Sequence, residues 1–198
     1  MSTNQPMRVA VLDCETLDLA STAVVYEIAF SVCEVTDNDY ANAIEVHARL
    51  ISLDIFEQLA AGRTFSADTL RFQQEVARSA GFSNFAEIYA ELLEEVPANG
   101  TKEALQELQV GLKGCDEVWI MKPTFDSPLL HSLAKDFGVE GDLWSHRSEM
   151  DMRTPLRKLL PAGYKRPKGP KHRAAYDVEH AWDILKNARF PNLSKDAK

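Results

Sequence analysis

The chain has 198 residues, of which 45% are hydrophobic and 26% are charged, as in an ordinary soluble domain with room for one core. A formal net charge of −8 argues against a protein that coats nucleic acid without specificity. No apolar run is long enough to span a bilayer, and the first residues, MSTNQPM, lack the basic and apolar segments of a signal peptide. The three cysteines have no metal-type or redox-type spacing, so we expect free thiols, a cytoplasmic location and no membrane partner.

The charge is unevenly distributed along the chain. Residues 153–173 contain eight Lys or Arg side chains and no Asp or Glu, which leaves a charge of −16 for the rest. A basic stretch on an acidic body could bind a phosphate backbone locally. Basic runs are also common as solvated loops, and charge alone does not separate these two interpretations.

The first half of the chain predicts strands followed by helices. Apolar residues at 7–12, 24–35 and 44–51 indicate three strands in succession, which is typical of an antiparallel meander. The periodicity then becomes helical, with capping residues and glycines at the expected ends. The later elements are expected to be helices at 67–80, 84–96 and 102–113 (with Thr101 as N-cap), a strand at 118–121, a helix at 123–137, a strand at 143–146, and helices at 151–160 and 174–188.

This order of elements predicts an α/β fold in which a mixed sheet is flanked by helices. We expect one domain over residues 1–198, with a helical insert at about 53–113 and a basic loop at about 161–173.

Two carboxylates follow the first apolar strand in the motif VLDCET. Side chains alternate along a strand, so Asp13 and Glu15 share one face and Cys14 lies on the other. Two carboxylates on one face repel each other unless a cation lies between them, and hard divalent cations prefer such oxygen ligands. The alternative is a strand that ends at the surface with both acids in water.

Asp126 follows the strand at 118–121 and falls in the first turn of the next helix. An acid at this position is favoured by the helix dipole, which is the simple explanation for it. The alternative interpretation is a third metal ligand, placed where the strand leads into the helix.

His172 and Asp177 lie five residues apart before and within the last predicted helix. They do not stack on one regular helix, so they can meet only if His172 lies on the loop and Asp177 in the helix start. Histidine is the side chain best suited to accept a proton near neutral pH. The alternative is an exposed loop histidine.

The ordered set of motifs resembles the DEDDh 3′→5′ exonucleases of the ribonuclease H-like superfamily. The three motifs are VLDCET, FDSPLL and HRAAYDV. The segments VWIMKPTFD, EMDMRTPL and GRTFSADTLRFQQ look like those of the small phage and bacterial exodeoxyribonucleases and exoribonucleases. The resemblance extends over about residues 7–189 and implies a ribonuclease H-like sheet: a three-stranded antiparallel meander joined by parallel strands and flanked by helices.

The resemblance also implies a site and an activity. Two divalent ions, Mg²⁺ or Mn²⁺, would be held by Asp13, Glu15, Asp126 and Asp177, and His172 would act as the general base. The reaction implied is removal of 5′-mononucleotides from single-stranded 3′ ends. Further residues expected to contact the substrate are Thr16 and Leu17 at the terminal nucleotide, and Arg153, Lys171 and Arg173 at phosphates.

Several alternatives stay open on the sequence. The phage-type resemblance slightly favours DNA over RNA as the substrate, and an exoribonuclease that trims RNA 3′ ends is the alternative, because discrimination rests on contacts to the 2′-hydroxyl. A catalytically inactive nucleic-acid-binding module on the same fold is a second hypothesis, and a structural α/β protein is a third. Monomer and homodimer are both open, and the resemblance implies a bacterial or phage-infected host cell.

Overall fold

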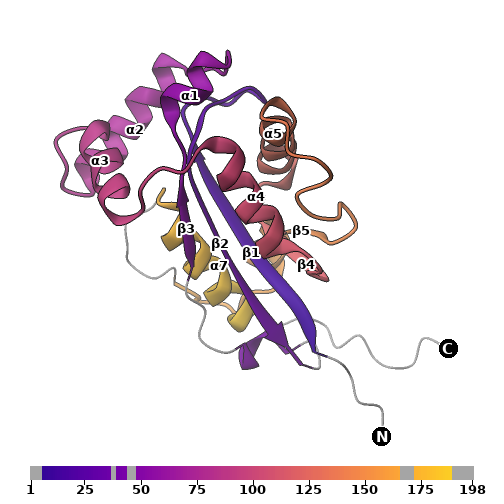
Figure 1. Cartoon of the computed structure of the whole chain (residues 1–198). Helices are drawn as coiled ribbons and strands as arrows, with labels where there is room; N and C mark the ends of the chain where they lie inside the picture. Colours follow the sequence, from indigo (N-terminus) through magenta and orange to yellow (C-terminus); the bar gives the residue numbers. More distant parts are fainter. Residues whose placement is uncertain (1–5, 37–38, 44–47, 166–171, 189–198) are drawn as a thin grey trace, which may run out of the picture.

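A five-stranded mixed sheet lies at the centre of the computed structural model, which describes residues 6–36, 39–43, 48–165 and 172–188 (Figure 1). In chain order its strands are β1 (Met7–Thr16), β2 (Val25–Val35), β3 (Arg49–Ser52), β4 (Glu117–Ile120) and β5 (Glu149–Asp151). The spatial order is β3-β2-β1-β4-β5. The pairs β1–β2 and β2–β3 are antiparallel, and the pairs β1–β4 and β4–β5 are parallel. The predicted meander extended by parallel strands is confirmed.

Seven α-helices and one short 3₁₀ helix surround this sheet within the described ranges. They are α1 (Ile55–Ala60), α2 (Ala67–Ser79), α3 (Phe85–Glu95), α4 (Thr101–Leu112), α5 (Pro123–Asp136), α6 (Arg153–Lys158), α7 (Ala174–Asn187) and the 3₁₀ helix η1 (Tyr40–Asn42). No helix in this part of the chain is long and apolar enough to cross a bilayer. All three cysteines are free thiols, as predicted.

The alternation of side chains along β1 divides the core between the two faces of the sheet. Ala10 and Leu12 belong to a cluster that contains the buried leucines of α4 and α5. Val9 and Val11 belong to a second cluster that contains the buried face of α7. Figure 1 shows α4 and α5 on one side of the sheet and α7 on the other. Each face of β1 is therefore covered by a different part of the chain.

Helices α1, α2 and α3 gather at one end of the sheet, away from the chain termini (Figure 1). A third apolar cluster attaches them there, in which the ring of Tyr26 on β2 meets the ring of Phe85 on α3 edge-on at 5.0 Å. α1 was not predicted from the sequence. It is only six residues long and is started by Asp54, whose side chain accepts hydrogen bonds from the first-turn N–H groups of Phe56 and Glu57.

Three expectations about local structure differ from the fold. The strand predicted at 143–146 is wrong, because the fifth strand is Glu149–Asp151; Leu143 and Trp144 are apolar because they pack into the core from a loop. The N-cap of α4 is Gly100, and Thr101 lies inside the helix. The predicted helix at 151–160 is shorter, because Asp151 still pairs in β5 and the helix begins at Arg153. Residues 44–47 of the predicted third strand lie outside the described ranges.

Candidate active site

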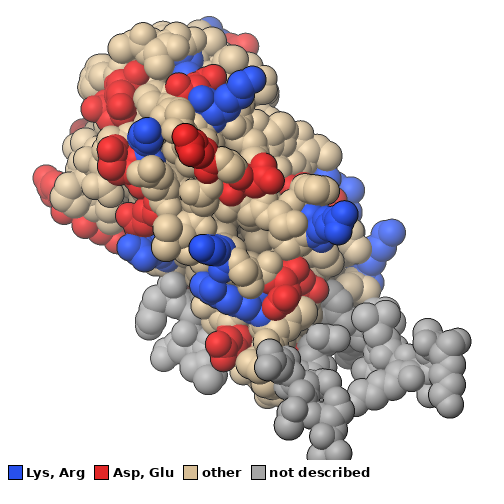
Figure 2. Space-filling model, turned by 45° about the vertical axis from the view of Figure 1, so that its right-hand side comes forward, with Lys and Arg blue, Asp and Glu red and all other residues tan. Residues whose placement is uncertain are grey.

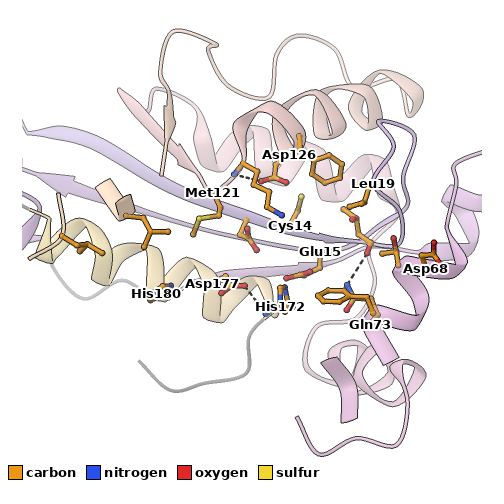
Figure 3. A pocket seen from close by; sticks show the side chains of 18 of the residues that line it. Cys14, Glu15, Leu19, Asp68, Gln73, Met121, Asp126, His172, Asp177 and His180 are labelled. Atoms are coloured by element: carbon orange, nitrogen blue, oxygen red, sulfur yellow. Dashed lines mark hydrogen bonds between the residues drawn. The ribbon is translucent and has the colours of Figure 1, made fainter. Parts of the chain in front are cut away.

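A pocket of about 970 Å³ opens at the carboxyl end of β1. Its lining includes all five residues singled out by the three motifs: Asp13, Glu15, Asp126, His172 and Asp177. They come from three places in the fold, namely the end of β1, the start of α5 and the start of α7 (Figure 3). The structure therefore brings together residues that are up to 164 positions apart in the sequence.

The strand β1 delivers two carboxylates to the face covered by α7. Asp13 and Glu15 continue the alternation that places Val9 and Val11 on this face. Glu15 is 8% exposed and Asp13 is half-buried. Cys14, between them, packs into the cluster on the opposite face, as the sequence predicted.

Asp126 reaches the pocket because α5 begins directly after β4. The helix has Pro123 in its first turn, and Asp126 lies in that same turn. Its side chain is buried and accepts a hydrogen bond from the backbone N–H of Lys122 at 3.2 Å, which is drawn in Figure 3. Burial raises the pKa of Asp126 to about 6, and that hydrogen bond and the Lys122 charge oppose the rise.

His172 is held just before α7, on the loop side of the helix start, where the five-residue spacing requires it. Its backbone φ of 62° lies in the left-handed region and is the one such value among the described non-glycine residues. That conformation costs about 1–2 kcal/mol for a residue with a Cβ atom. The N–H of His172 donates to the Asp177 carboxylate at 3.2 Å (Figure 3), and its ring meets the ring of Phe72 edge-on at 4.9 Å.

The carboxylates of the pocket act on one another electrostatically. The pKa of Asp13 is raised well above its ordinary value by burial and then by the charges of Glu15, Asp126 and Asp177. The pKa of Glu15 is also raised, first by burial and then by the charges of Glu27 and Asp177. Without a cation, these groups therefore hold protons more tightly than carboxyls in water do.

The donor set fits a divalent cation. Ligand atoms of Glu15, His172 and Asp177 all lie within 4.8 Å of one another. Asp13 lies near this group, since the charges of Glu15 and Asp177 contribute to the rise of its pKa. Carboxylate oxygens are the ligands that Mg²⁺ and Mn²⁺ prefer, and a cation among them would offset the mutual repulsion that raises their pKa values.

Sequence reasoning missed the contribution of α2 to the pocket. Phe72 and Gln73 both line it, beside Leu19 from the loop after β1. The Gln73 side chain is buried and donates to the backbone carbonyl of Thr16 at 3.4 Å (Figure 3). One feature of the segment GRTFSADTLRFQQ could have indicated this contribution, namely the aromatic Phe72 in a helix that is otherwise largely polar. An aromatic residue in a helix more often belongs to the core than to a site, so the sequence alone does not assign it.

The expected substrate contacts fall into two groups. Thr16 is buried and lines the pocket, whereas Leu17 packs into the third apolar cluster beside it. Arg153 forms a two-pronged pair with Asp151 through Nε and a terminal nitrogen, at 2.9 Å and 2.8 Å. Lys171 lies outside the described residues.

Arg173, which we expected at a phosphate, is turned inward. Its side chain is only 15% exposed and pairs with the buried carboxylate of Glu27. Figure 2 shows acidic and basic side chains interspersed on the face in view, without one continuous basic band there. Glu27 is the partner of Arg173 in this conformation, and a contact of Arg173 with a phosphate stays a prediction.

No protein-family model and no curated protein matches the sequence. Solved structures of E. coli exonuclease I do resemble the chain. A zinc-bound complex with single-stranded DNA gives a TM-score of 0.62 at 12% identity, over 92% of this chain and 40% of that one. A complex with a dT13 oligonucleotide gives a TM-score of 0.60 at 12% identity, and the match covers 91% of this chain and 40% of that one.

The chain thus spans about two fifths of the length of these neighbours. At this identity the likeness establishes the fold, and it confirms the mixed α/β sheet predicted from the sequence. Membership of the ribonuclease H-like superfamily, and of its small phage and bacterial group, stays a prediction. The chain therefore has an α/β fold like that of the solved exonuclease I structures.

Proposed function

We propose that this protein is a metal-dependent 3′→5′ exonuclease that releases 5′-mononucleotides from single-stranded ends, with DNA as the preferred substrate. The observation that carries the proposal is the convergence of four carboxylates and one histidine in a single pocket. The exonuclease I neighbours were solved with single-stranded DNA, which supports the class of reaction and substrate.

Asp13, Glu15, Asp126 and Asp177 are the residues that would hold two divalent ions. Bound there, such ions would supply positive charge beside the attacking water and the leaving 3′ oxygen. The raised pKa values of Asp13 and Glu15 mean that these side chains must lose protons as they become ligands.

His172 is the proposed general base. A ring nitrogen takes a proton from the attacking water, the water oxygen forms a bond to the terminal phosphorus, and the bond from phosphorus to the 3′ oxygen breaks. A nucleoside 5′-monophosphate leaves, and the released 3′ oxygen takes up a proton from solvent to become the new 3′-hydroxyl of the shortened strand. The Asp177 carboxylate holds the backbone of His172 in place, because it accepts a hydrogen bond from the His172 N–H.

The apolar wall of the pocket suits a nucleobase. Phe72 is 44% exposed and Leu19 is 75% exposed, which is unusual for large apolar side chains beside an acidic cluster. Aromatic faces stack bases of any sequence, and a single strand presents its bases for such stacking. We therefore assign Phe72 and Leu19 to the terminal base, and Thr16 to the backbone next to it.

The test is a gel assay on single-stranded DNA and RNA of one sequence, each labelled at the 5′ end. We expect a ladder that shrinks from the 3′ end in Mg²⁺ or Mn²⁺, disappears in chelator, and forms faster on DNA. Faster degradation of RNA would make the protein an exoribonuclease. Binding of both strands without any ladder would contradict the proposal and favour an inactive binding module.

A further inference from the structure

A fifth carboxylate lies beside the acidic cluster and belongs to none of the three motifs. Glu27 on β2 is directly opposite Glu15 in the antiparallel β1–β2 pair. Residues opposite each other in such a pair point to the same face, so Glu27 also faces α7. Its side chain is 0% exposed. A buried carboxylate needs partners, and those of Glu27 identify its role.

Both oxygens of Glu27 are used by the start of α7. Oε1 accepts the backbone N–H of Ala174 at 2.9 Å, and Oε2 accepts Nε–H of Arg173 at 3.3 Å. The N-cap residue, Arg173, forms no side-chain capping bond of its own. The first N–H groups of a helix have no partner within the helix, so Glu27 acts as the cap from the neighbouring strand.

The residue next to this anchored helix start is His172. Its left-handed backbone is held by the N–H bond to Asp177, and its ring is held by the edge of Phe72. The Arg173 side chain also approaches Glu91 of α3 at 3.9 Å. The segment that carries the general base is thus fastened to β2, to α2 and to α3.

We propose that Glu27 is a positioning residue, which anchors the start of α7 to β2 and thereby holds His172 over the carboxylate cluster. Glu27 is not assigned as a metal ligand, because donors from α7 occupy both of its oxygens. The inference deepens the proposed function, since it concerns how the same site keeps its base in place.

The kinetic test uses Glu27→Gln, which keeps the size of the side chain and removes the charge that pairs with Arg173. We expect kcat on single-stranded DNA to fall roughly ten- to hundredfold, as for a small misplacement of a catalytic group, with KM and Mn²⁺ affinity changed less than about threefold. Arg173→Gln removes the same pair from the other side and should behave alike if Glu27→Gln folds poorly.

A double-mutant cycle separates positioning from general damage. In a His172→Ala background, Glu27→Gln should lower kcat by less than about twofold, because the side chain that Glu27 positions is already absent. Ser31→Ala is the matched control: it removes a hydrogen bond from Trp182 of α7 to the same strand, far from His172 along the helix, and should leave kcat within about twofold of wild type. If Glu27→Gln lowers kcat by the same factor in the wild-type and His172→Ala proteins, the proposal is overturned.

NMR measures the position of the His172 ring without depending on enzyme activity. We expect a nuclear Overhauser effect between the ring protons of Phe72 and His172 in wild type and in Ser31→Ala, and its loss in Glu27→Gln. Retention of that signal in the folded Glu27→Gln protein would overturn the proposal. A wild-type protein that cleaves no nucleic acid would contradict the proposed function, and the NMR result would still decide whether Glu27 holds His172.

Discussion

Carboxylates lie at both ends of the sheet face that α7 covers, and the two ends hold them in different ways. At the start of β4, Glu117 accepts hydrogen bonds from the Tyr40 hydroxyl and from the Trp119 indole N–H. At the end of β1, Asp13 and Glu15 face further carboxylates, and burial together with those charges raises their pKa values. The first group already has hydrogen-bond donors, whereas the repulsion in the second would be relieved by a cation.

The comparison teaches how to separate structural acids from functional ones. A half-buried carboxylate with neutral donors, such as Glu117, or a buried one with a cationic partner, such as Glu27 with Arg173, holds the neighbouring elements in place. A group of carboxylates that share one pocket costs free energy in the metal-free protein. Substituting carboxylates that have such partners and carboxylates that share the pocket should therefore give different results.

The largest expected effect comes from Asp13→Asn. We expect exonuclease activity to fall by at least about a thousandfold, because one of the residues proposed to hold the ions is lost. The initial rate on 5′-labelled single-stranded DNA in Mg²⁺ measures it. Glu117→Gln is the matched control at the other end of the face and should keep activity within about twofold while lowering the free energy of unfolding by about 1–2 kcal/mol. Full activity of Asp13→Asn would reject the site.

The second prediction concerns Asp126→Asn and pH. The folded pKa of about 6 lies above the ordinary value of 3.8, so folding favours the protonated carboxyl. The stability that this group contributes is present below about pH 4 and is lost as pH rises through about 6. At pH 7.5 the difference corresponds to about 3 kcal/mol.

In chelator at pH 7.5, we therefore expect Asp126→Asn to unfold at a higher urea concentration than wild type, and the two proteins to converge near pH 4. Excess Mg²⁺ should stabilise wild type and reverse the order. A variant that is no more stable than wild type in chelator at pH 7.5 would refute this account of Asp126.

The third prediction compares two exposed phenylalanines. Phe72→Ala should raise KM for single-stranded DNA by about tenfold, because stacking of one base contributes about 1–3 kcal/mol. Phe56 is 76% exposed on α1 and is absent from the pocket lining. Phe56→Ala should leave KM unchanged. Equal effects of the two substitutions in steady-state assays would remove the stacking role from Phe72.

The smallest expected effect concerns two arginine–carboxylate pairs. Arg153 pairs with Asp151 close to the pocket, and Arg49 pairs with Glu107 at 2.7 Å on the edge strand. If Arg153 contacts a phosphate, Arg153→Gln should weaken DNA binding a few-fold and reduce the slope of log K against log salt by about 1. Arg49→Gln should not change the slope, as measured by fluorescence anisotropy in Ca²⁺.

Much of the site followed from local rules in the sequence. The alternation of β1 placed Asp13 and Glu15 together, and the helix that begins after β4 placed Asp126 near them. The five-residue spacing required His172 to precede α7, and the structure has this arrangement. Each of these inferences needed only the geometry of one element and its start.

The parts that could not be predicted depend on contacts between distant segments. Glu27 is one of a few polar residues in a mostly apolar strand, and its partner Arg173 follows 146 residues later. Leu143 and Trp144 had the composition of a strand, yet they are buried from a loop. The placement of Phe72 against His172 depends on how α2 packs at the end of the sheet, which no periodicity in the sequence encodes.

The most direct test of the central claim is a calorimetric titration of Mn²⁺ into the metal-free protein at pH 7.5, in two buffers of different ionisation enthalpy. We predict binding of two ions per chain with release of protons from the carboxylate cluster, abolished by Asp13→Asn and unaffected by Glu117→Gln. Absence of binding by wild type, or binding that Asp13→Asn leaves unchanged, would contradict the claim that these carboxylates are gathered for a divalent cation.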